Sequence, residues 1–150
     1  DNKNGICFGH YRDGRVFIKE NNGDVAYGFS HIKNNITGNE ITKNTEAGLA
    51  LSFTMGNNIS ANNISNNCIG IRLRDCSNNI VQYNNFIDNM LLNAVDMLQN
   101  QWDMNYWDNW IGLKISILDF LPYYIPGTLF ANLDFHPAQE PYDIDWIMGG

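Results

Sequence analysis

The chain has 150 residues, a net charge of −7 and 44% hydrophobic residues, which is enough apolar material for one folded domain. Disorder is excluded because disordered chains are poor in aromatic residues, whereas 13% of this one is aromatic. The charge is uneven, since residues 1–74 hold eight basic and six acidic side chains and residues 75–150 hold one and ten. The acidic half would repel phosphate, so nucleic acid is not an expected partner.

The first 27 residues predict two strands, Gly5–Phe8 and Arg15–Lys19, around an Arg-Asp-Gly turn. They follow the pattern of the rest of the chain poorly and are expected to form an irregular first turn of it. The chain opens with polar residues and shows no signal peptide, so either a mature protein or an excised fragment is expected, and the Gly-Gly end favours a fragment.

From residue 34 onward, Asn-Asn pairs followed by an aliphatic residue recur with a period of about 22 residues. Asn34-Asn35-Ile36, Asn57-Asn58-Ile59 and Asn78-Asn79-Ile80 are separated by 23 and 21 residues. A second set of pairs, at residues 39, 62 and 84, and a third set of alternating apolar segments, at residues 48 and 70, keep the same period. Three independent markers with one period predict a repeat protein.

Each repeat contains short strands joined by tight turns, because residues 70–75 alternate apolar and charged side chains. Asparagine favours such turns, since it tolerates left-handed dihedral angles. Two or three short strands per 22 residues are typical of one turn of a right-handed parallel β-helix, an all-β solenoid whose strands stack at about 4.8 Å. Stacking predicts one inward column of Ile36, Ile59 and Ile80, and another of Ile41, Ile64 and Phe86. It also predicts an Asn ladder of Asn35, Asn58 and Asn79.

The last fifty residues differ, because the Asn pairs stop near residue 101 and 11 of the 19 aromatic residues follow, with all four prolines. A solenoid end exposes its core and needs a cap. We therefore expect β-helix turns over residues 1–100 and an irregular aromatic cap over residues 101–150. Residues 113–121 are compatible with a short helix or a strand. The longest apolar stretch, residues 111–130, contains two charges and two prolines, which excludes a membrane span.

The segment Asn93–Gly112 resembles the end of the repeats in NosD-type β-helix proteins, where Asn-x-x-Asp and then Trp-Asp-x-Asn-Tyr-Trp follow one another. The tail after residue 120 is similar to archaeal surface members, so the resemblance covers roughly residues 28–144. The matching positions are Asn93, Asp96, Trp102, Asp103, Asn105, Tyr106 and Trp107.

The resemblance implies an exported protein, located in the periplasm, at the cell surface or outside the cell. The founding members assist copper-centre maturation of nitrous oxide reductase, and most relatives have no known role. Copper delivery requires clustered Met, His or Cys ligands. His10, His31 and His136 are scattered, and only Cys7 lies close to a histidine, so copper handling is an alternative that the residues do not favour.

The three cysteines, Cys7, Cys68 and Cys76, form no C-x-x-C pair and predict neither a zinc ribbon nor a redox motif. Cys68 and Cys76 flank an expected strand, so a disulfide between them would require the chain to fold back. Small buried side chains are the expectation for them. No cofactor and no metal site are predicted, although Ca²⁺ would suit the acidic and aromatic cluster near residue 105.

β-Helices also carry polysaccharide lyases, epimerases and hydrolases, which need clustered carboxylates and a basic residue. The outward Arg72 and Arg74 have only Ala50 and Ser52 one turn earlier, so no column of catalytic groups is expected. A non-catalytic module is therefore favoured, acting as a scaffold or binding a polysaccharide or another cell-envelope component. An outward column of Asp and Arg would favour an enzyme instead. The candidate ligand-binding residues are Asp103, Tyr106, Trp107, Asp108, Trp110, Arg72 and Arg74.

Overall fold

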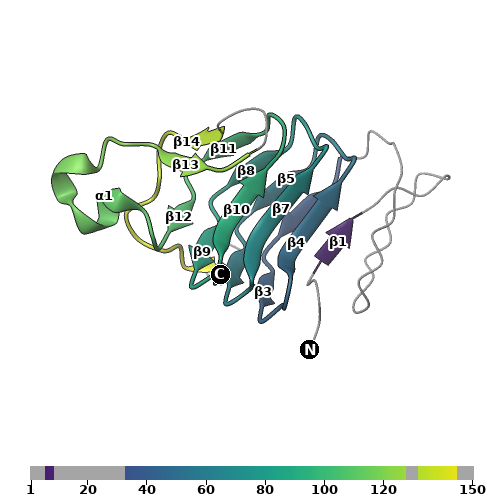
Figure 1. Ribbon diagram of the computed structural model, residues 1–150, viewed down its shortest axis with the longest axis horizontal. Coiled ribbons are helices and arrows are strands. Elements are labelled where there is room, and N and C mark those ends of the chain that lie inside the picture. The colour runs from purple at the N-terminus through teal and green to yellow at the C-terminus, as the bar shows by residue number, and fades with distance from the viewer. Residues whose placement is uncertain (1–5, 9–32, 128–131, 145–150) are drawn as a thin grey trace.

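The computed structural model describes residues 6–8, 33–127 and 132–144. Its strands are wound into a coil whose sides are three sheets (Figure 1). Each turn of the coil contributes one short strand to each sheet. The strands are almost all parallel, so the predicted all-β parallel β-helix is confirmed. The first two turns contain β2 (Asn35–Thr37), β3 (Glu40–Thr42), β4 (Ala47–Ser52), β5 (Asn58–Ser60), β6 (Asn63–Ser65) and β7 (Ile69–Arg74). They are followed by β8 (Ile80–Gln82), β9 (Asn85–Ile87), β10 (Leu92–Asp96), β11 (Gln101–Asp103) and β12 (Tyr106–Trp107).

The three faces of the coil are named here in chain order. Sheet I has the strand order β13-β14-β11-β8-β5-β2, sheet II has β12-β9-β6-β3, and sheet III has β1-β4-β7-β10, with β1 spanning Ile6–Phe8. β1 pairs in parallel with β4 and so belongs to the coil, as predicted for that strand. The predicted strand at residues 15–19 lies outside the described residues.

The interior of the coil is filled by columns of side chains that come from equivalent positions of successive turns. Ile41, Ile64 and Phe86 are in register and buried, which confirms the predicted column of sheet II, and Trp107 extends it. The prediction for sheet I is wrong at its third member. Ile59 pairs with Val81, and Ile80 is 38% exposed, because the third turn is aligned one residue later than the Asn-Asn-Ile pattern indicates.

The corner between sheets I and II is built from one left-handed residue followed by an asparagine. Gly38, Ala61, Tyr83 and Met104 each have φ between 52° and 68° and come directly after a strand of sheet I. The next residue is Asn39, Asn62, Asn84 or Asn105, and its Nδ2 donates to the carbonyl two residues earlier. That hydrogen bond crosses the left-handed residue and closes the turn. At this corner the asparagine does not itself adopt the left-handed conformation. It stabilises the turn from the position directly after the left-handed residue.

The C-terminal residues close the end of the coil with short helices and strands. α1 (Ile111–Lys114) and η1 (Ser116–Leu118) occupy the segment for which the sequence left helix and strand open. β13 (Tyr123–Ile125) and β14 (Asn132–Asp134) form an antiparallel pair, and β14 stacks in parallel on β11. The division of the chain at residue 100 stays a prediction, and β11 and β12 stack on β8 and β9 in the manner of the earlier turns. None of the described helices has the length and hydropathy needed to cross a bilayer.

Candidate functional site

Buried asparagines stack along three corners of the coil. In each column, the backbone N–H and the side-chain Nδ2 of one asparagine both donate to the Oδ1 of the asparagine one turn later, at 2.7–3.2 Å. The hydrogen bonds between stacked asparagines therefore all run toward the C-terminal end. The columns are Asn34–Asn57–Asn79–Asn100, Asn39–Asn62–Asn84–Asn105 and Asn44–Asn67–Asn89.

The predicted Asn ladder had different members. Asn35 and Asn58 do pair in register, but Asn58 then pairs with Ile80, and Asn79 stacks on Asn57 instead. The inward member of an Asn-Asn pair is the first one at Asn34, Asn57, Asn62 and Asn84, but it is the second one at Asn67 and Asn79. In each pair the amide of the inward member is bonded within its column, and the other member lies outside the column.

The last asparagine of each column has no further asparagine to donate to, so its donors need a different acceptor where the coil ends. In the first column, Asn100 donates through Nδ2 to Asp96 Oδ1 at 2.8 Å. Asp96 is fully buried and also accepts the Trp102 indole N–H at 2.9 Å. Burial raises the pKa of the Asp96 carboxyl above its usual value, and the hydrogen bonds from Trp102 and Asn100 oppose that shift.

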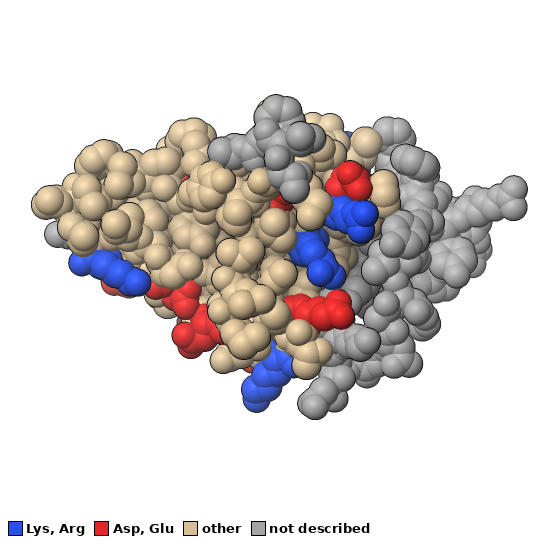
Figure 2. Space-filling model, in the orientation of Figure 1, with Lys and Arg blue, Asp and Glu red and all other residues tan. Residues whose placement is uncertain are grey.

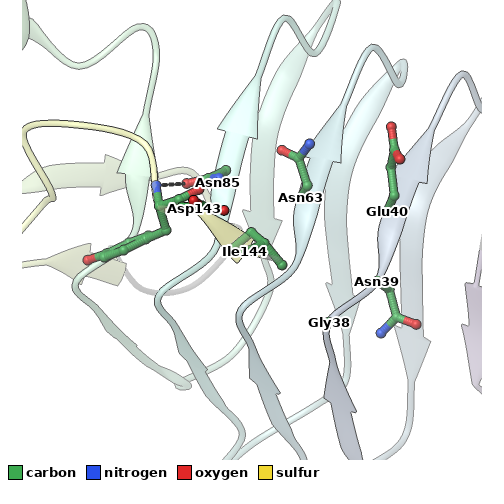
Figure 3. Close-up of a pocket in the computed structure, with 8 residues that line it drawn as sticks. Gly38, Asn39, Glu40, Asn63, Asn85, Asp143 and Ile144 are labelled. Carbon is green, nitrogen blue, oxygen red and sulfur yellow. Dashed lines mark hydrogen bonds between the residues drawn. The ribbon is translucent and has the colours of Figure 1, made fainter. Parts of the chain in front are cut away.

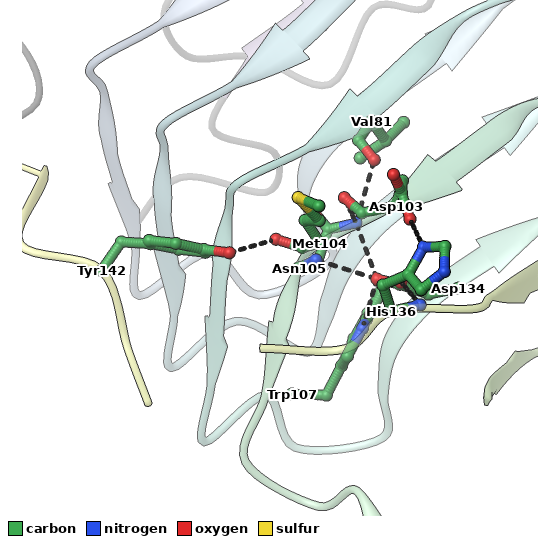
Figure 4. Close-up of polar contacts among 8 residues, drawn as sticks. All are labelled: Val81, Asp103, Met104, Asn105, Trp107, Asp134, His136 and Tyr142. Atoms are coloured by element: carbon green, nitrogen blue, oxygen red, sulfur yellow. Dashed lines mark hydrogen bonds and ion pairs between the residues drawn. The ribbon is translucent and has the colours of Figure 1, made fainter. Parts of the chain in front are cut away.

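The second column ends on Asp134, which is also fully buried (Figure 4). Its Oδ2 accepts three hydrogen bonds: from the Asn105 backbone N–H at 2.9 Å, from Asn105 Nδ2 at 3.1 Å and from the Trp107 indole N–H at 3.0 Å. Its Oδ1 accepts the His136 backbone N–H at 3.1 Å. A single carboxylate thus satisfies the end of the column and a core tryptophan.

The third column ends through an intermediate amide. Asn89 donates to Asn93 Oδ1 at 2.9 Å, and Asn93 donates to Asp108 Oδ1 at 2.9 Å. Asp108 Oδ2 also accepts the Asp88 backbone N–H at 2.6 Å. This predicted ligand-binding residue is therefore occupied in closing the coil.

Two further predicted ligand-binding residues, Trp107 and Trp110, are core residues with 0% and 2% exposure. Trp107 stacks between Phe86 and Tyr123, with ring centroids 4.2 Å and 4.1 Å away and nearly parallel planes. Trp110 donates its indole N–H to the Leu121 carbonyl. Their ring faces are covered by protein, so they stabilise the cap and present no stacking surface.

The remaining predicted residues are more accessible but lie on different faces. Asp103 is on the outer side of sheet I, and its Oδ1 lies 2.7 Å from His136 Nδ1. Tyr106 is half-buried in sheet II and forms a β-bridge with Ala138. Arg72 and Arg74 lie on sheet III near Glu46 and Asp75, at 3.7 and 3.6 Å. Basic and acidic side chains accordingly lie next to one another in Figure 2. The structure does not bring the seven residues into one cluster.

The outer face of sheet I carries polar side chains at equivalent positions of successive turns. Thr37, Ser60, Gln82 and Asp103 are in register on β2, β5, β8 and β11. Tyr124 on β13 is 56% exposed, whereas its neighbours Tyr123 and Ile125 pack against the core. Sequence reasoning missed Tyr124 because the turn that places it on this sheet is formed by β13 and β14, which do not follow the 22-residue repeat.

The residues after β14 run over the outer face of sheet II, where they border a hollow of about 230 Å³ (Figure 3). The hollow is lined by Gly38, Asn39, Glu40, Asn63, Asn85, Tyr142, Asp143 and Ile144. Asn85 holds this segment with both ends of its amide, accepting the Tyr142 N–H and donating to the Tyr142 carbonyl, each at 2.8 Å. The Tyr142 hydroxyl donates to the Met104 carbonyl at 2.7 Å, and burial raises the pKa of Tyr142 to about 12.

A second hollow has two sulfur-containing residues, Cys68 and Met90, among its lining residues, together with Asp88 and Lys43. Cys68 and Cys76 are both free thiols, and burial raises the pKa of Cys76. No cluster of three or more His, Cys, Asp or Glu side chains occurs within residues 33–127 and 132–144. The side chain of Cys7, and the whole of His10 and His31, lie outside the described part of the chain.

A protein-family model described as "Periplasmic copper-binding protein (NosD)" matches residues 1–113. The searches of curated proteins and of solved structures each returned no match. The match covers well over half of the 150 residues, and it includes the asparagine columns and the Trp-Asp-x-Asn-Tyr-Trp segment that ends them. The chain belongs to the NosD family of parallel β-helix proteins.

Proposed function

We propose that this protein is an exported, periplasmic β-helix module that is not catalytic and that binds an extended cell-envelope polysaccharide along the outer face of sheet I. The family description supports the compartment. The observation that carries the binding role is the column of Thr37, Ser60, Gln82 and Asp103. The exposed Tyr124 lies on β13, two strands beyond β11 in the same sheet.

The column suits a polymer because its hydrogen-bonding groups recur at the strand spacing of about 4.8 Å. Hydroxyl and amide side chains both donate and accept, as sugar hydroxyls do. Tyr124 adds an amphipathic aromatic face two strands further along the same sheet, where a sugar ring could stack. The sequence assigned the aromatic role to Trp107 and Trp110, and the exposed Tyr124 takes their place in this proposal.

The column contains one carboxylate and no arginine, whereas a lyase or hydrolase needs several charged groups within one substrate site. Arg72 is flanked in its sheet by Ala50 and Val95, so the arginines of sheet III form no column either. These neighbours favour a binding module over a carbohydrate-active enzyme.

Binding of the purified protein to a polysaccharide array, first with Ca²⁺ and then with chelator, tests this proposal. We expect saturable binding to one glycan class, and we expect Tyr124→Ala to weaken it about tenfold, or about 1.4 kcal/mol. Phe120→Ala is the matched control, because Phe120 is also an exposed aromatic residue and lies outside sheet I. Cleaved products on incubation would favour the enzyme instead, and absent binding would leave a structural scaffold.

Copper binding is a second candidate function, and the hollow that Cys68 and Met90 line favours it. A thiolate and a thioether are ligands that copper(I) prefers. The sequence alone argued against copper, since it did not indicate that these two residues are close. Copper(I) titration of the reduced protein tests this candidate: Cys68→Ser and Met90→Leu should each lower the affinity, and Cys76→Ser should not. Affinity unchanged in Cys68→Ser would exclude the hollow as the site.

A further inference from the structure

We propose that the hollow on sheet II binds a second peptide segment, an extended chain with a Lys or Arg side chain, through the amide of Asn63 and the carboxylate of Glu40. This site is on a different face from sheet I and is independent of the polysaccharide proposal. The starting observation is the way in which Asn85 holds the backbone of Tyr142 (Figure 3).

Asn85 is itself one member of an outward column. Glu40 on β3, Asn63 on β6 and Asn85 on β9 are in register, so their side chains succeed one another at about 4.8 Å across sheet II. At Asn85 the primary amide pairs with one residue of an extended chain and uses both its donor and its acceptor. The molecule therefore already contains one example of a peptide docked on this column.

Asn63 has the same amide one turn earlier, but its Oδ1 is shielded from water and has no hydrogen-bond partner. A buried carbonyl oxygen without a donor lowers stability, because it has lost water and gained no partner. Asn63 lines the hollow beside Ile144, where the described part of this segment ends. Rotation about the soft Cβ–Cγ torsion turns the amide into the hollow, where an arriving N–H removes that cost.

Two features select the kind of partner. A backbone N–H and C=O from one residue match the two ends of the amide, as Tyr142 does at Asn85. Glu40 is exposed at the open end of the hollow and supplies a negative charge for a basic side chain. Gly38, in the left-handed region at φ 68°, has no side chain to obstruct the approach.

Fluorescence anisotropy of the full chain with a labelled, capped Thr-Lys-Thr-Lys-Thr-Lys peptide tests the site. The expected result is saturable binding that falls about tenfold in Asn63→Ala and in Glu40→Gln. Asn58→Ala is the matched control, because Asn58 also has an unpartnered Oδ1 but does not line the hollow, and it should bind as the wild type does. Melting temperatures are measured for every variant, and only variants that stay folded are compared.

Two altered probes separate this proposal from others. The same peptide with alternate backbone nitrogens methylated lacks the N–H donors and should bind at least about tenfold more weakly. An oligomer of N-acetylglucosamine offers acetamide groups on a sugar chain and should not compete. Equal binding of the methylated peptide, competition by the sugar, an equal loss in Asn58→Ala, or no binding at all would each overturn the proposal.

Discussion

Removal of the Asp134 carboxylate should be among the most damaging single changes in the cap. Asp134→Ala leaves the Asn105 backbone N–H and the Trp107 indole N–H without their acceptor, and both residues are completely buried. Asn105 Nδ2 also loses a partner, but it keeps the Val81 and Asp103 carbonyls. An unsatisfied buried donor costs about 1–3 kcal/mol. Two such donors lose their acceptor, so a loss of about 2–5 kcal/mol in the free energy of unfolding is expected. That is a large part of the roughly 5–15 kcal/mol available to a domain.

Asp134→Asn separates the charge from the hydrogen bonds. The remaining oxygen can still face the three donors, but the new amide N–H₂ then faces the His136 backbone N–H, which is also a donor. We therefore expect a smaller loss, about 1–3 kcal/mol. Asp119→Ala, at an exposed acid in the same cap, is the control and should stay within about 0.5 kcal/mol.

Urea denaturation followed by near-ultraviolet circular dichroism measures these changes, because Trp107 lies at the affected end of the core. If the free energy of unfolding of Asp134→Ala lies within about 1 kcal/mol of the wild-type value, the donors have other partners. The view that a carboxylate is needed to end the asparagine column would then be wrong.

Four further substitutions test the register, the packing and the buried charge. Val81→Ala should cost about 2 kcal/mol and Ile80→Ala less than about 1 kcal/mol, because only Val81 points into the core; the reverse order in urea would contradict the alignment. Gly70→Ala should cost more than about 2 kcal/mol, since its Cβ would overlap the Asn93 carbonyl oxygen, and an unchanged melting temperature would show that the strands can separate. Burial raises the folded-state pKa of Asp96, so the fold favours the protonated carboxyl. The stability that this protonated group contributes is fully present below about pH 4 and is lost as the pH rises through the higher folded-state pKa. Asp96→Asn should therefore gain stability relative to the wild type between about pH 4 and pH 7, and a stability difference that does not change with pH would refute this.

The sequence predicted the coil well because its period is carried by several markers at once. Ile41, Ile64 and Phe86 were assigned correctly, since the spacing of their Asn pairs follows the true register. Ile80 was assigned to the core by the same pattern, but the third turn is one residue out of phase with it. A single asparagine pair cannot distinguish the inward member from the outward one, whereas the hydrogen-bonded columns do.

The surfaces were harder to predict than the coil. Tyr124 and Asn63 became candidate binding residues only when the closing strands and the segment after them were placed on sheets I and II. Asp134 lies 29 residues from Asn105, and no pattern in the sequence connects the two. Contacts of this kind depend on where the chain returns after the repeats, which local periodicity does not encode.

The residues that identify the family are largely those that end the coil, and this limits what the family says about function. Asp96 and Asn105 end or continue asparagine columns, and Trp102 and Trp107 donate to the carboxylates beneath them. The hydrogen bonds between stacked asparagines all run in one direction, so the last asparagine of each column needs an acceptor where the coil ends. The motif supplies part of that ending. The two binding roles proposed above therefore rest on other side chains, Tyr124 on sheet I and Asn63 and Glu40 on sheet II, which take no part in the asparagine columns.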